Sequence, residues 1–257
     1  MHIPRIYIPL PLSEHTQIEL DKASMHHLVT VMRMKVGRQV ILFNNVPIGG
    51  RYGEFTATLT SVDKKQARVD IGEFASPQIE SPLQVHLGTC LIKNDRMDWL
   101  LQKATELGVS EITPLFSQYT DVKLPAERIE KKMEHWRKIV INACEQSGRV
   151  RLPVLHKPLA LEKWVASSSH VRQKFVLHPY ASSSPHTSAD HAQESSPPSD
   201  TNAIALLVGP EGGLTENEVD LAVQSQFKGM RLGPRILRAE TAPLVALAVL
   251  SQQLGDF

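Results

Sequence analysis

The first 75 residues contain short runs in which apolar and polar side chains alternate. Three of these runs, 39–43, 55–59 and 67–71, are typical of strands with one buried face. A glycine-rich segment at 49–53 predicts a turn between the first two. The apolar spacing from Met25 to Met34 predicts one short helix. We therefore expect a small β-barrel over residues 1–75.

Two Ser-Pro pairs between residues 75 and 82 predict a linker, and the pattern then changes. Apolar strands alternate with helical stripes as far as the C-terminus. The strands are expected at 83–90, 112–116, 175–177 and 204–208. The helices are expected at 97–107, at 129–143, after the capping-box pair Thr215 and Glu218, and from Pro243 to about Leu254. This alternation predicts an α/β domain with a mostly parallel sheet over residues 82–257.

Residues 181–200 differ in composition from the rest of the chain. They contain seven serines and three prolines and no large apolar side chain. Such a segment cannot bury enough apolar surface to offset the entropy of ordering, so we expect a disordered surface loop. His186 and His191 lie in it, but no cysteine or pair of carboxylates completes a ligand set. We therefore predict no metal site.

Charge and composition indicate the cellular compartment more clearly than they indicate the function. The formal net charge is +1, so any nucleic-acid surface must be a local basic patch. Two cysteines are too few for a disulfide framework, which favours a reducing compartment. The N-terminus has three prolines among its first eleven residues and does not resemble a signal peptide, and no apolar run is long enough to span a membrane. We expect a cytoplasmic protein without membrane partners.

The segment 207–215, LVGPEGGLT, runs from an apolar strand through a glycine-rich turn into a capped helix. In α/β sheets, ligands bind where strands end at such turns. Glycines allow the backbone to approach a ligand closely. The turn lacks the Gly-Lys-Ser/Thr ending of a phosphate-binding P-loop and the GxGxxG pattern of dinucleotide sites. On its own, the segment is equally compatible with a simple tight turn.

A second segment, 232–242 or LGPRILRAETA, gathers two arginines, a carboxylate and a hydroxyl just before the final apolar helix. Its side chains could bind phosphate and a polar ligand. The alternative is surface charge followed by a threonine cap. The two segments together are more specific than either alone.

GPEGG followed by LGPRILRAETA resembles the cofactor-binding region of the SPOUT methyltransferases. The resemblance is strongest to the uridine-N3 methyltransferases of small-subunit ribosomal RNA (RsmE). Four other segments are similar to motifs of that family. They are IPRIY at 3–7, HHL and VMRMKVG within 26–37, DRM and QKATELGV within 95–109, and EQSGR at 145–149. Ala239 departs from the threonine that is usual in the family.

The resemblance implies the fold and the ligands. The N-terminal barrel would be a PUA-like RNA-binding module, and the C-terminal domain a SPOUT domain with a trefoil knot, acting as a homodimer without metal. S-adenosyl-L-methionine (SAM) would bind in the loops of the knot. The cofactor-binding residues would be Leu177, His178, Pro179, Gly209, Pro210, Glu211, Gly212, Gly213, Leu232, Gly233, Arg235, Ile236, Leu237 and Thr241.

The expected reaction is methyl transfer to N3 of a uridine in the decoding region of 16S ribosomal RNA, in the small subunit or its assembly intermediate. Uridine N3 carries a proton and is a poor nucleophile until the proton is lost, so a base or a cation should assist. Arg238 could stabilise the anion or hold a phosphate, and Glu240 could act as base or hold Arg238. Basic residues that suit phosphate contacts are Arg5, Arg33, Lys35, Lys93, Arg96 and Arg149.

Two alternatives remain open at this point. One is a SPOUT enzyme with another RNA target, such as a transfer-RNA ribose. The N-terminal barrel and the RILRAETA motif disfavour this alternative. The other is a non-catalytic RNA-binding factor for ribosome assembly, which the intact GPEGG turn disfavours.

Overall fold

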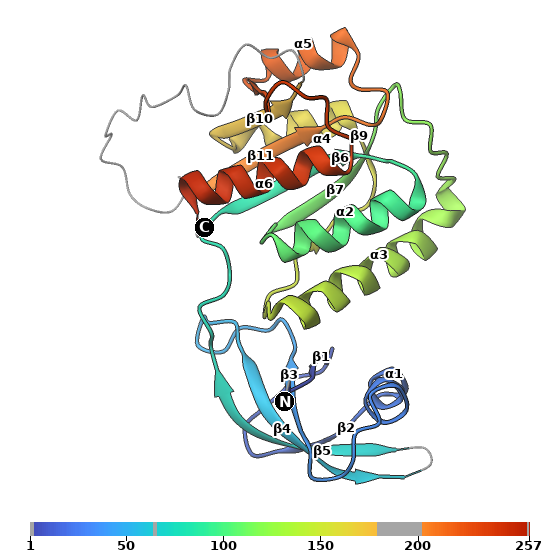
Figure 1. Cartoon of the computed structure of the whole chain (residues 1–257), viewed down its shortest axis with the longest axis vertical. Helices are drawn as coiled ribbons and strands as arrows, with labels where there is room; N and C mark the ends of the chain where they lie inside the picture. Colours follow the sequence, from blue (N-terminus) through green and yellow to red (C-terminus); the bar gives the residue numbers. More distant parts are fainter. Residues whose placement is uncertain (1–2, 64–65, 179–201, 256) are drawn as a thin grey trace. The chain divides into compact units, whose positions relative to one another are not determined.

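The computed structural model describes residues 3–63, 66–178, 202–255 and 257. These residues form two compact units (Figure 1). The first unit comprises Met1–Glu80 and Cys144–Leu152, and the second comprises Ser81–Ala143 and Pro153–Phe257. The sequence pattern assigned 144–152 to the second domain, whereas the structure groups this segment with the first unit.

The first unit is built on a mixed five-stranded sheet in the order β1-β3-β4-β5-β2. The strands are β1 (Arg5–Tyr7), β2 (Gln17–Glu19), β3 (Gln39–Phe43), β4 (Glu54–Val62) and β5 (Ala67–Ala75). The three strands that alternation predicted are present as β3, β4 and β5. On β4 and β5 every second side chain is buried, from Phe55 to Leu59 and from Ala67 to Ile71. The apolar positions therefore fix which face of the sheet carries the core.

The predicted helix begins and ends three residues earlier than the apolar spacing indicated. It consists of α1 (Lys22–Met25) and a π-helical turn, η1 (His26–Val31). The side chain of Asp21 caps it by accepting hydrogen bonds from the amides of Ala23 at 2.7 Å and Ser24 at 3.0 Å. Arg33 adopts a positive φ of 52°, a conformation that cannot continue a helix.

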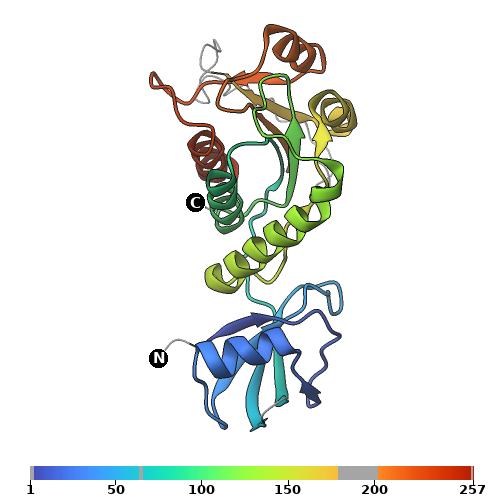
Figure 2. The ribbon, with the colours of Figure 1, turned by 90° about the vertical axis from the view of Figure 1, so that its right-hand side faces the viewer.

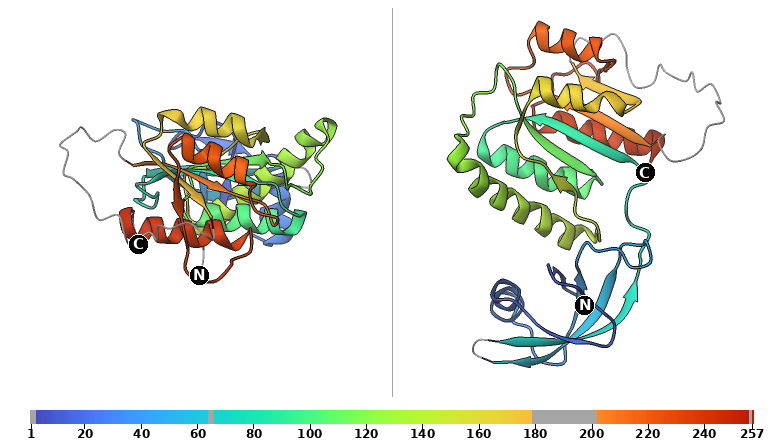
Figure 3. Two further views of the ribbon diagram at one scale, coloured as in Figure 1. Left: turned by 90° about the horizontal axis from the view of Figure 1, so that it is seen from above. Right: turned by 180° about the vertical axis from the view of Figure 1, so that it is seen from behind.

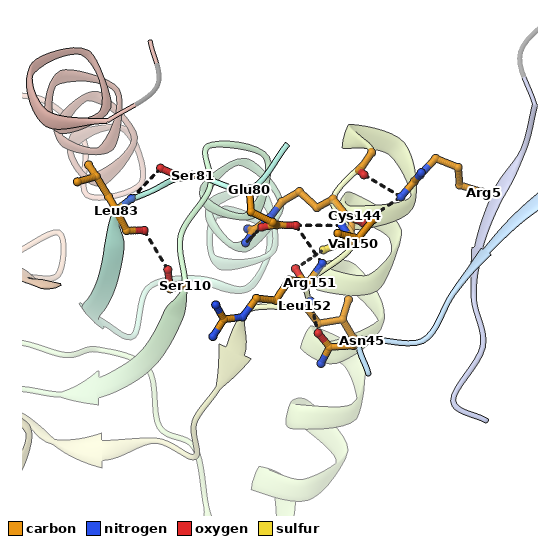
Figure 4. Close-up of polar contacts among 12 residues, drawn as sticks. Arg5, Asn45, Glu80, Ser81, Leu83, Ser110, Cys144, Val150, Arg151 and Leu152 are labelled. Carbon is orange, nitrogen blue, oxygen red and sulfur yellow. Dashed lines mark hydrogen bonds and ion pairs between the residues drawn. The ribbon is translucent and has the colours of Figure 1, made fainter. Parts of the chain in front are cut away.

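The segment 144–152 belongs to the first unit and is tied to it by partly buried hydrogen bonds (Figure 4). One carboxylate oxygen of Glu80 accepts from the amides of Val150 and Arg151, each at 2.9 Å. The other oxygen accepts from Nε of Arg149 at 3.0 Å. Asn45, which follows β3 with a φ of 56°, accepts from the amide of Leu152 at 2.9 Å. These bonds satisfy backbone groups that no strand or helix pairs.

The second unit is a parallel sheet with the order β12-β10-β11-β6-β7-β8, and β9 also pairs with β7. Its strands are β6 (Gln84–Cys90), β7 (Glu111–Phe116), β8 (Val154–Leu155), β9 (Leu159–Ala160), β10 (Gln173–Leu177), β11 (Ala203–Val208) and β12 (Lys228–Met230). Its helices are α2 (Asn94–Glu106), α3 (Ala126–Ser147), α4 (Leu161–Ser167), the short η2 (Ser168–His170), α5 (Glu216–Gln224) and α6 (Thr241–Leu254). The last four residues of α3 belong to the first unit. The predicted parallel α/β architecture is confirmed.

Helices cover both faces of this sheet (Figures 2 and 3). Ile204, Leu206 and Val208 of β11 belong to the core cluster that includes α2, α3 and α6. Ala205 and Leu207 point the opposite way, into a cluster with α4 and α5. A strand buried on both faces reads as a continuous apolar run, which is why 204–208 shows no polar alternation.

The expected disordered loop at 181–200 lies outside the described residues, and the trefoil knot stays a prediction. Among the helices that the structure describes, none combines the length and apolar character needed to cross a membrane.

Candidate functional site

Three neighbouring parallel strands, β10, β11 and β12, end at one edge of the second sheet and border a cavity of about 610 Å³. Its volume lies within the usual range of small-molecule sites. The amide of His178, just beyond β10, donates to the carbonyl of Met230 at the end of β12 at 3.2 Å, which joins two walls. The cavity therefore lies at the carboxyl ends of parallel strands, where α/β sheets bind ligands.

The glycine-rich turn after β11 forms one wall, and its shape depends on small residues. Gly213 has a φ of +75° and its amide donates to the carbonyl of Pro210 at 2.9 Å. A Cβ on Gly212 would lie 3.1 Å from Cβ of Tyr119. Thr215 and Glu218 form the predicted capping box, which fixes the start of α5 behind the turn.

The loop between β12 and α6 forms the facing wall. Gly233 has a φ of +96°, and its carbonyl accepts from Nε of Arg231 at 3.2 Å. The carbonyl of Arg238 accepts from the amides of Thr241 and Ala242, both at 2.9 Å, and so closes the loop onto the first turn of α6. Ile236 of this loop lines the cavity and is 77% exposed.

The structure gathers most of the predicted cofactor residues around this single cavity. Those that line it are Leu177, His178, Gly209, Pro210, Glu211, Gly212, Gly213, Leu232, Gly233, Arg235, Ile236 and Leu237. Thr241, the first residue of α6, does not line the cavity. Pro179 lies outside the described residues.

Sequence reasoning missed several apolar members of the lining, namely Val208, Leu214, Met230, Ala239 and Ala242. Val208 and Met230 end strands, so strand direction was the signal that could have found them, and the other three lie within the two predicted segments. Arg96 also lines the cavity, although the sequence suggested only a phosphate contact for it.

Two carboxylates and two arginines meet beside the cavity. Nη1 of Arg96 donates to Oε1 of Glu211 at 3.1 Å, and Nε of Arg96 lies 3.7 Å from Oε1 of Glu240. Nη1 of Arg238 lies 3.9 Å from the same oxygen of Glu240. Glu240 is buried and does not line the cavity, whereas Arg238 lines it with a largely exposed side chain.

His86, Glu111 and His156 form the one group within the described part of the chain whose ligand atoms lie close enough for a metal ion. The indole N–H of Trp164 donates to Nε2 of His86 at 3.0 Å, and an indole can only donate. Nδ1 of the neutral His86 ring must then carry the proton and offers no lone pair. Burial lowers the pKa of His86 to about 4, against a smaller opposite effect of Glu111. We therefore assign a hydrogen-bonded cluster here, not a metal site.

Apart from Arg96, which lines the cavity, the predicted RNA-contact residues divide into two groups. Arg33, Lys35 and Lys93 are exposed. Arg149 is buried against Glu80, with 2.8 Å between Nη2 and the carboxylate. Arg5 pairs with Glu54 and donates to the carbonyls of Gly148 at 2.7 Å and of Arg149 at 3.1 Å.

Comparison with known families defines the class of protein to which this fold and cavity belong. A model described as an RNA methyltransferase domain matches residues 79–251, and one described as an RNA methyltransferase PUA domain matches residues 20–72. The match to the RNA methyltransferase domain includes every residue that lines the cavity. The match to the PUA domain covers β3, β4 and most of β5 in the first unit.

The chain belongs to the family of ribosomal RNA small subunit methyltransferase E. It is 34% identical to the family member from Buchnera aphidicola of Schizaphis graminum over 99% of this chain and 98% of that one. It is 33% identical to the Bacillus subtilis member over 94% and 92% of the two chains. The structure is similar to that of ribosomal RNA small subunit methyltransferase E from Neisseria gonorrhoeae bound to S-adenosyl methionine, with a TM-score of 0.86 and 32% identity over the whole of both chains.

Proposed function

We propose that this protein transfers a methyl group from SAM to N3 of a uridine in the 16S RNA of the small ribosomal subunit. The observation that carries the proposal is the single cavity that both glycine-containing segments line. Its setting within a family of small-subunit RNA methyltransferases, one of which was crystallised with SAM, supports the same cofactor here.

The residues present fit this cofactor. The backbone at Gly212 is left uncovered by a side chain, and a Cβ there would crowd Tyr119. The lining combines apolar side chains such as Leu232 and Leu237 with backbone polar groups of the glycine turn, which suits a ligand with an adenine ring and a zwitterionic end. When bound, the sulfonium supplies an activated methyl group, so no metal is required.

The protein's task is then to hold the uridine in line with the methyl group and to favour loss of the N3 proton. Of the two roles left open for Glu240, we propose the positioning role. Its carboxylate is buried and lies near both Arg96 and Arg238, and it does not face the cavity. Arg238 is 76% exposed at the cavity rim, which favours a contact with an RNA phosphate over a fixed place beside the reacting base.

We also propose that exposed cations hold the ribosomal RNA substrate. Arg33 and Lys35 lie in the first unit, next to exposed Val31 and Met32, and Lys93 lies at the start of α2 in the second. An RNA substrate and the absence of a membrane-spanning helix in the described residues fit a cytoplasmic enzyme. Methylation assays on naked RNA, on the small subunit and on an assembly intermediate would identify which of the three is the substrate.

We further propose a homodimer that buries the partly covered apolar side of α6. Leu244, Val245 and Val249 are only half-buried, although they belong to the uninterrupted apolar run 242–250 of the helix. One chain has a mass of 28.6 kDa, and sedimentation at micromolar concentration should give twice that mass. A monomer would contradict this proposal without affecting that of the cofactor cavity.

Methylation of purified small subunits with labelled SAM tests the function directly. Digestion of the RNA to nucleosides should place the label in N3-methyluridine. Label in a ribose methyl group would support a different target of the same fold. Binding of SAM or RNA without transfer would support a non-catalytic assembly factor.

A further inference from the structure

We infer that Arg96 is a catalytic residue. Its guanidinium is the fixed cation that stabilises the anion formed when the target uridine loses its N3 proton. The inference rests on the proposed function and adds to it a second cavity for the nucleotide and a named group that faces the reacting base.

Arg96 lies on the border between two cavities of the second unit. It lines the cavity assigned to SAM and also a neighbouring cavity of about 490 Å³, whose other lining residues are Lys93, Asp95 and Val122. Of the described residues that line the two cavities, only Arg96 is shared. A group that reacts with a ligand in the first cavity must approach from an adjoining space. The second cavity provides such a space, with Lys93 available for the phosphate of the same nucleotide.

Two carboxylates hold the Arg96 side chain in place. Glu211, from the glycine-rich turn, accepts a hydrogen bond from Nη1 at 3.1 Å, and Glu240, before α6, lies 3.7 Å from Nε. The Glu240 side chain is 10% exposed, and its Oε2 has no hydrogen-bond partner among the described residues. A desolvated carboxylate strongly favours a nearby cation. Arg96 is therefore positioned before the substrate arrives.

Arg238 is the natural comparison, because it approaches the same carboxylate. Its side chain is 76% exposed, against 40% for Arg96, and its nearest approach to Glu240 is 3.9 Å. Electrostatic catalysis requires charges that do not need to reorganise during the reaction. Of these two arginines, Arg96 meets that requirement better.

The chemical step balances without a further reagent. The N3–H bond of uridine breaks, the proton passes to water, and the electron pair stays on the base. That pair then forms the N3–methyl bond while the carbon–sulfur bond breaks and its electrons remain on sulfur. A guanidinium beside the base stabilises the anion more than the neutral uridine, so the barrier falls. The other charged groups around this position are Lys93, Asp95, Glu211, Arg238 and Glu240.

The test compares Arg96→Ala and Arg238→Ala in single-turnover methylation of small subunits, with SAM and RNA both saturating. Arg96→Ala should lower the rate by roughly 10²–10³, the scale found when one such electrostatic donor is lost. The deficit should shrink as the pH rises, because more uridine anion then forms without help. Arg238→Ala should weaken RNA binding and leave the saturated rate within a few-fold of wild type.

Two further variants keep the test decisive. Arg96→Gln retains hydrogen-bond donors near Glu240 and should show the same pH-dependent deficit if the alanine variant fails to fold. Lys103→Ala, on the same helix and paired with Glu106 at 2.8 Å, is the matched control and should transfer methyl groups at the wild-type rate.

Four results would overturn the inference. Weaker RNA binding with a normal saturated rate would make Arg96 a phosphate contact. Weaker SAM binding alone would make it a ligand of the cofactor. A pH-dependent deficit in Arg238→Ala but not in Arg96→Ala would transfer the role to Arg238. A wild-type protein that forms no N3-methyluridine would overturn the proposed function as well, whereas the first three results leave it intact.

Discussion

Two arginine-containing motifs of this chain, one in each unit, show how differently the same side chain can be used. In the first unit, Arg149 of the EQSGR segment is buried and bonded to Glu80. In the second unit, Arg238 of the RILRAETA segment is exposed at the rim of a cavity. Both were candidates for contact with RNA or substrate on the basis of sequence. Burial and bonding, which a motif does not reveal, separate them.

The difference in burial between Arg149 and Arg238 follows from the backbone hydrogen bonds around each segment. The chain at 148–152 has backbone groups that lie outside any sheet or helix, and Glu80, Arg5 and Asn45 provide their partners. The turn at 209–213 instead lines a cavity and has one internal bond, from the amide of Gly213 to the carbonyl of Pro210. A charged motif that completes the hydrogen bonds of neighbouring backbone supports the fold, whereas a glycine motif that lines a cavity can bring its backbone close to a ligand.

The largest expected effect is on stability and concerns Arg149. Arg149→Ala removes the guanidinium beside Glu80, which is 23% exposed and keeps its two backbone hydrogen bonds, so the cost should lie at the lower end of that for a buried pair, roughly 3 kcal/mol. We expect this loss in the unfolding free energy of the first unit, measured by urea denaturation with a signal from that unit. Lys35→Ala, at an exposed cation of the same unit, should change stability by less than about 0.5 kcal/mol and instead weaken RNA binding. Similar stabilities for the two variants would contradict a structural role for Arg149.

The next effect concerns a partly buried histidine in the second unit, His86, and appears only in acid. The folded protein favours the neutral ring of His86, since burial lowers its pKa to about 4 from an ordinary value of 6.5. This contribution to stability is complete above about pH 6.5 and is lost as the pH falls towards 4, by at most about 3 kcal/mol. His86→Gln keeps an acceptor for Trp164 and cannot titrate, so its stability should fall less over this range. Parallel pH profiles for wild type and variant would contradict the assignment.

The smallest effect compares two helix caps. Thr215→Ala at α5 and Asp21→Ala at α1 should each lower stability by about 1 kcal/mol, because each removes a side-chain cap. Only Thr215 follows the glycine-rich turn, so only Thr215→Ala should also weaken SAM binding. Titration of SAM into both variants checks this. Equal SAM affinities would show that the cap does not influence the cavity.

Most of the architecture could be predicted from the sequence because the periodicities are clear. The run 204–208 and the capping box at Thr215 both appear where the pattern indicated. The helix near Met25 was displaced because the Asp21 cap and the left-handed Arg33 outweighed the apolar spacing. The assignment of residues 144–152 to the first unit could not be predicted, since it depends on hydrogen bonds to Glu80, far away in the sequence.

The candidate site was predictable to the extent that its residues are contiguous. The two glycine segments could be identified from local sequence alone, and the structure brings them to one cavity. The position of Arg96 was not predictable, because it depends on how the start of α2 meets two loops more than 100 residues further along the chain. The separate roles of Arg238 and Glu240 likewise depended on exposure, which adjacent positions in a sequence do not reveal.

The central claim, that the glycine-rich turn forms the SAM site, is tested most directly by calorimetric titration of SAM into Gly212→Val. A branched side chain there would crowd Tyr119, which a Cβ alone would approach to 3.1 Å, and would occupy the face that the cofactor needs. We expect affinity to fall at least about tenfold, or about 1.4 kcal/mol. Gln224→Val, which places the same side chain on the exposed side of α5, should bind as wild type does. A folded Gly212→Val protein with unchanged SAM affinity would contradict the account.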